Sequence, residues 1–74
     1  MPQTKRRQII AILGVDRLDE DSIHKYCVSK GYPHLGETIY LFLNNTLEET
    51  ADILDVDIST LTRRINKFID TAKV

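Results

Sequence analysis

The chain has 74 residues, of which 42% are hydrophobic and 28% charged, and its formal net charge is −1. This length predicts one domain spanning residues 1–74 and leaves little room for a preorganised catalytic cleft, so we do not expect an enzyme. No apolar run approaches the ~18 residues that span a bilayer, and the short stretch 9–15 makes no convincing signal peptide. We therefore expect a cytoplasmic protein with no membrane partner.

Charge is segregated along the chain. Residues 1–17 carry four cations against one acid, and so do residues 58–74, whereas residues 18–57 carry two cations against nine acids. A basic face for phosphates forms if the fold brings the two ends to one side. The alternative is that these charges are ordinary solvated helix faces.

Turn-forming residues divide the chain into five segments of helical length, which predicts an all-α domain of four to five helices. The breaks fall at Gly14 and at residues 19–21, 31–33, 44–45 and 55–57. The first segment, about residues 3–13, contains an apolar run that fits a short strand as well as a helix, and we favour the helix.

The second and third segments are both predicted helices, but they differ in polarity. The second begins at Asp21 or Ser22, which cap free amides, and stops at Gly31. The third runs from about His34 to Asn44 and is apolar on nearly every side. Such a helix must be covered all round, either by its own domain or by another subunit.

The fourth segment starts with a capping box, in which the Thr46 hydroxyl and the Glu49 carboxylate each accept the other residue's amide. Leu47, Ala51 and Leu54 then lie on one face of a helix of two turns. Residues 55–57 follow as a turn.

The fifth segment is a longer amphipathic helix with Asp57 as its expected N-cap. Its apolar stripe consists of Ile58, Leu61, Ile65, Phe68, Ile69 and Ala72. The opposite face holds Ser59, Arg63, Asn66, Lys67 and Asp70. A short helix, a three-residue turn and a longer helix form a helix-turn-helix, whose second helix lies in the DNA major groove.

The exposed side of this last helix carries residue types that suit double-stranded DNA. Arg63 pairs with guanine and Asn66 with adenine, Arg64 and Lys67 neutralise phosphates, and the hydroxyls bond bases or phosphates. The expected DNA contacts are Ser59, Thr60, Thr62, Arg63, Arg64, Asn66 and Lys67.

The sequence from Thr46 to Phe68 resembles the DNA-binding helix-turn-helix of the Fis family, a motif that also closes bacterial nitrogen-regulator-type enhancer-binding activators. The closest similarity is Ser-Thr-Leu-Thr-Arg-Arg-Ile at residues 59–65. The resemblance covers about residues 35–69, with the third segment standing where the family has a dimerising helix. It implies a homodimer that presents two recognition helices to successive major grooves, and a protein that binds DNA in this way is expected to be nucleoid-associated.

Two residues of the turn depart from the family pattern. Asp55 stands where the family has Gly, and Asp tolerates the left-handed backbone better than most residues do. Asp57 stands near a position from which family members reach DNA with a polar or basic side chain. Residues 1–34 match no part of the family and have no assigned role.

Two other interpretations use different residues. Acidic residues 48–57 or the apolar third helix would serve as the contact surface of a small protein-interaction adaptor that does not bind DNA. His24, Cys27 and His34 are potential metal ligands, but a structural zinc site needs a fourth, so we expect no metal and no cofactor. We expect Cys27 to be a buried small hydrophobe, and one unpaired thiol is typical of a reducing compartment.

Overall fold

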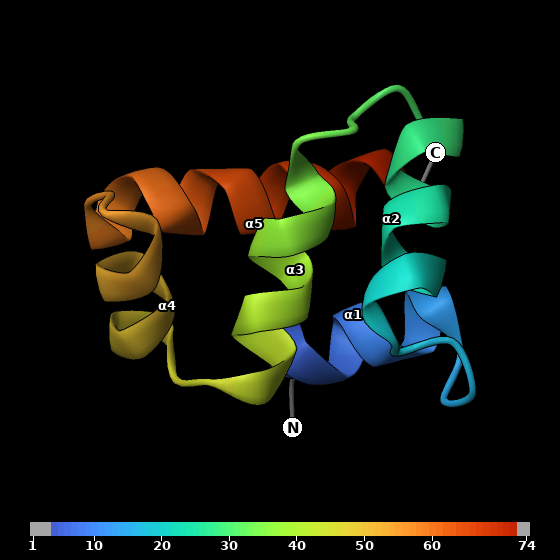
Figure 1. Ribbon diagram of the computed structural model, residues 1–74, viewed down its shortest axis with the longest axis horizontal. Coiled ribbons are helices and arrows are strands. Elements are labelled where there is room, and N and C mark those ends of the chain that lie inside the picture. The colour runs from blue at the N-terminus through green and yellow to red at the C-terminus, as the bar shows by residue number, and fades with distance from the viewer. Residues whose placement is uncertain (1–3, 73–74) are drawn as a thin grey trace.

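The computed structural model describes residues 4–72, which form five helices and no strand within that range (Figure 1). The helices are α1 (Lys5–Leu13), α2 (Glu20–Ser29), α3 (Leu35–Asn44), α4 (Leu47–Leu54) and α5 (Ile58–Ala72). The all-α prediction is confirmed, and the ambiguous first segment is a helix. Gln3, where that predicted segment begins, lies outside the described residues. No helix of residues 4–72 is long and apolar enough to cross a membrane.

The N-cap of α2 lies two to three residues before the predicted Asp21 or Ser22, so that prediction was wrong. The N-cap is Asp19, whose carboxylate accepts the Ser22 amide at 3.0 Å. Hydrogen bonding from the Ser22 side chain, and next from its amide, holds the pKa of Asp19 below its usual value. Asp21 instead lies in the first turn, where a carboxylate is favoured by the helix dipole, and it pairs with Lys25 at 3.1 Å.

Helix α3 occupies the middle of the domain, with α2 and α4 on either side and α5 crossing behind it in the view of Figure 1. Gly36 is buried where α2 and α3 meet, and a Cβ at this position would lie only 3.1 Å from the Cα of His24. The two helices therefore approach each other closely because residue 36 has no side chain.

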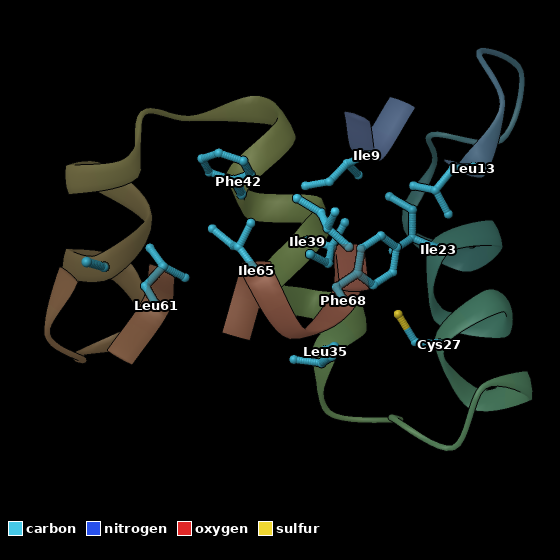
Figure 2. Close-up of a cluster of buried hydrophobic side chains, with 12 residues drawn as sticks. Ile9, Leu13, Ile23, Cys27, Leu35, Ile39, Phe42, Leu61, Ile65 and Phe68 are labelled. Carbon is cyan, nitrogen blue, oxygen red and sulfur yellow. The ribbon is translucent and has the colours of Figure 1, made fainter. Parts of the chain in front are cut away.

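All five helices contribute side chains to one core (Figure 2). Five aliphatic side chains at its centre have no exposed surface: Ile9, Ile23, Ile39, Leu61 and Ile65. The apolar α3 is covered within a single chain by α2, α4 and α5, and none of its large apolar side chains is exposed. The domain itself therefore covers most of the apolar surface of α3, while Tyr40, Leu41 and Leu43 remain half-buried.

Arg6 attaches the start of α1 to the end of α3. Its Nη2 donates to the carbonyls of Phe42 at 3.1 Å and Asn45 at 2.8 Å, and its guanidinium lies 5.3 Å from the centre of the Phe42 ring. The last carbonyls of a helix have no partner within the helix, so a distant cation that binds them acts as a C-cap. The basic N-terminal residues therefore include one with a structural role.

Candidate nucleic-acid interface

The start of α4 has the predicted capping box. The Glu49 amide donates to the Thr46 hydroxyl at 3.1 Å, and the Thr46 amide donates to the Glu49 carboxylate at 3.2 Å. Thr50 is fully buried, and its hydroxyl lies 2.8 Å from the Thr46 carbonyl and 3.3 Å from that of Leu41. The Leu41 carbonyl belongs to α3, so the Thr50 hydroxyl joins α4 to the preceding helix. The sequence did not predict this role of Thr50, because the contact depends on how the two helices pack.

The turn between α4 and α5 has the conformation that its residues predict. Asp55 is left-handed, with φ 56° and ψ 47°, and its amide donates to the Asp52 backbone carbonyl at 3.2 Å. The Val56 amide reaches back to the Ala51 carbonyl at 3.0 Å, which completes a Schellman motif. These bonds end α4 and direct the chain into α5.

Helix α5 packs on the core through Leu61, Ile65, Phe68 and Ile69, as its predicted stripe requires. It begins directly after Asp57, whose carbonyl accepts the Leu61 amide at 3.0 Å. The prediction that Ile58 belongs to the buried stripe is wrong, because this side chain is 45% exposed. Ile58 lies ahead of the first buried turn and lines a hollow between α4 and α5.

The predicted DNA-contacting residues differ in how accessible they are. Five are exposed and two, Thr60 and Thr62, are half-buried. The exposed ones are Ser59, Arg63, Arg64, Asn66 and Lys67. The Lys67 ammonium lies 4.9 Å above the Tyr32 ring, so it partly covers the loop between α2 and α3. Within residues 4–72 the one ion pair joins Lys25 and Asp21. Arg63 and Arg64 therefore have no acidic partner in that range.

The other end of the helix-turn-helix is acidic. An open hollow of about 770 Å³ lies between α4 and the first turn of α5. Its carboxylate lining consists of Glu48, Glu49, Asp52, Asp55 and Asp57. Thr60 lines the same hollow, so a phosphate at this hydroxyl would lie among carboxylates, while the cations of α5 begin one turn later. The surface of the α4–α5 unit is therefore negative at the start of α5 and positive beyond it.

The two basic ends of the chain belong to neighbouring helices, since α1 packs against α5. Lys5 and Arg7 of α1 are exposed, whereas the guanidinium of Arg6 binds the end of α3.

The three potential metal ligands are not gathered into one site. Cys27 is buried in the core, as expected, and burial raises the pKa of its thiol to about 11. His24 and His34 are exposed and line a shallow hollow at the starts of α2 and α3. In the part of the chain that the structure describes, no three His, Cys, Asp or Glu side chains form a group that could hold a metal ion.

A scan against protein-family models, a search of curated proteins and a search of solved structures each found no match to this chain. The resemblance to the Fis family therefore rests on the residues of the motif.

Proposed function

We propose that this protein is a sequence-specific DNA-binding protein, a small bacterial or phage transcription regulator that inserts α5 into the major groove. The observation that carries the proposal is the α4–turn–α5 unit, with a left-handed Asp55 and an α5 whose outward side is polar and cationic. In a helix-turn-helix of this kind the second helix enters the groove and the first crosses above the backbone.

Different side chains on the outward side of α5 contact the bases and the phosphates. Arg63 has the fork of donors that matches guanine O6 and N7, and Asn66 one turn further matches adenine. Arg64 and Lys67 flank them and are the phosphate contacts. Lys67 leaves the Tyr32 ring at little cost, because an exposed cation–π contact contributes only about 0.5–1 kcal/mol.

The proposal includes a homodimer. Two recognition helices of a dimer reach half-sites about 34 Å apart, one turn of the double helix. The longest dimension of this domain is 31 Å, so one domain fits one half-site. The few cations on one α5 also favour a dimer, since two copies double the number of phosphate contacts.

A second candidate function is a protein-interaction adaptor, and the acidic hollow favours it. Five carboxylates line that hollow, between α4 and the first turn of α5, where a DNA-binding motif approaches the phosphate backbone. Under this alternative, acidic residues 48–57 bind another protein and α5 never enters a groove.

The experiment is a titration of the purified chain against duplexes selected from a random-sequence pool, with the number of bound chains measured. We expect two chains per site. Arg63→Ala should cost about 1–3 kcal/mol on the selected site and relax preference at one base pair, whereas Lys67→Ala should weaken all sequences alike and lower the salt slope by about one unit per chain. Lys25→Ala, which removes an exposed cation of α2, is the matched control and should change neither property.

The adaptor alternative gives different results with the same variants. Affinity for every duplex would stay at ordinary non-specific levels, Arg63→Ala would not alter it, and Asp52→Asn would weaken the binding of a protein partner.

A further inference from the structure

One exposed apolar side chain lies at the start of the proposed recognition helix. Within residues 4–72 four large hydrophobic side chains are exposed, and Ile58 is the one on α5. It is the first residue of that helix and is 45% exposed, whereas Leu61, one turn later, is fully buried. The described chain therefore leaves an aliphatic surface at the tip of α5.

The position of Ile58 defines what it would meet on DNA. The N-terminal residues of a recognition helix contact base edges in the major groove. Among the groups that base pairs present there, the C5-methyl group of thymine is the apolar one. An aliphatic side chain at this position is complementary to that methyl group and to no other feature of the groove.

The charges around Ile58 are compatible with the same base pair. Asp55 and Asp57 line the hollow together with Ile58. Every base pair presents one amino donor in the major groove, on adenine or on cytosine, and a carboxylate can accept from either. The carboxylates at this end of α5 are therefore compatible with an A·T pair beneath it, and the choice of thymine depends on Ile58 alone.

We propose that Ile58 is a specificity-determining residue that contacts a thymine methyl group, so that the protein prefers thymine at one position of each half-site. This inference rests on the proposed DNA binding and adds to it one base and the side chain that selects it.

The test replaces each thymine of the selected duplex in turn by deoxyuridine, which keeps base pairing and lacks the methyl group. For the unaltered chain we expect one replacement per half-site to weaken binding about fourfold, the effect of removing roughly one buried methyl-sized group. Ile58→Ala should bind the thymine and deoxyuridine duplexes equally, and Ile58→Val should retain most of the discrimination. Because Ile58 is uncharged, the salt slope should stay the same in both variants.

The matched control is Ile53→Ala, which removes an exposed isoleucine of α4 and should keep the full preference for thymine. Thermal melting should confirm that Ile58→Ala is folded, since the side chain is already half exposed. The inference is overturned if the chain binds its selected duplex and every deoxyuridine replacement is neutral, or if Ile58→Ala keeps the discrimination. Absence of any DNA binding would overturn the proposed function as well, so the two failures are distinguishable.

Discussion

Asp55→Gly tests the turn that joins the two helices of the proposed DNA-binding unit. Asp55 holds φ 56° and ψ 47°, a left-handed conformation that costs an L-residue roughly 1–2 kcal/mol, and somewhat less for Asp. Glycine removes this strain but adds about 0.5–1 kcal/mol of backbone entropy to the unfolded chain. The substitution also removes one of the five carboxylates that line the hollow. The free energy of unfolding should therefore stay the same or rise by up to about 1 kcal/mol.

The assay is thermal unfolding followed by circular dichroism at low and high salt. In a domain of this size about 1 kcal/mol shifts the midpoint by roughly 4–8 °C. Asp55→Asn separates the two contributions, because it removes the charge and keeps a side chain that tolerates the left-handed backbone. Asp55→Val should lower the midpoint, since a β-branched residue fits this backbone poorly. A large loss of stability in Asp55→Gly would contradict this expectation and would mean that the Asp55 carboxylate makes a bond that stabilises the turn.

The remaining predictions concern the first helix and the core. Arg6→Ala should lower the free energy of unfolding in urea by about 1 kcal/mol, because it removes the hydrogen bonds to the Phe42 and Asn45 carbonyls at the end of α3. Arg7→Ala, which removes an exposed arginine, is the control. Equal free energies of unfolding for the two variants would contradict this prediction. The Cys27 thiol, with its pKa raised to about 11, should react with alkylating reagents only when the protein opens. Rapid alkylation of the folded protein would contradict this. The thiol of the unfolded chain has a pKa of about 8.5, so the stabilisation from burying the neutral thiol should be complete below that pH. It should be lost as the pH rises toward the pKa of the folded protein, which unfolding in urea at several pH values measures.

Features with local signals were predictable from the sequence. The capping box needs only Thr46 and Glu49 three residues apart, and both of its hydrogen bonds are present. The left-handed turn depends on a residue that tolerates positive φ, and Asp55 adopts it. The buried stripe of α5 follows from a period of 3.6 residues and is correct from Leu61 to Ile69.

Features that depend on packing between distant segments were not predictable in this way. Ile58 continues the periodic stripe, but it lines the open hollow beside α4 and is 45% exposed. The cap of α2 is ambiguous in sequence, because residues 19–22 offer four polar side chains in a row and only the geometry selects Asp19. The roles of Arg6 and Thr50 depend on carbonyls of α3, and the acidic hollow forms only when α4 is folded against the start of α5.

The salt dependence of the affinity of the unaltered chain for its selected duplex tests most directly whether α5 binds DNA. Arg64 and Lys67 are the two proposed phosphate contacts of each chain, so a dimer should lose affinity linearly in a double-logarithmic plot with a slope of about −3 to −4. We expect tight binding at low salt with this slope. Absence of binding even at low ionic strength would contradict it and favour a protein partner for the acidic hollow.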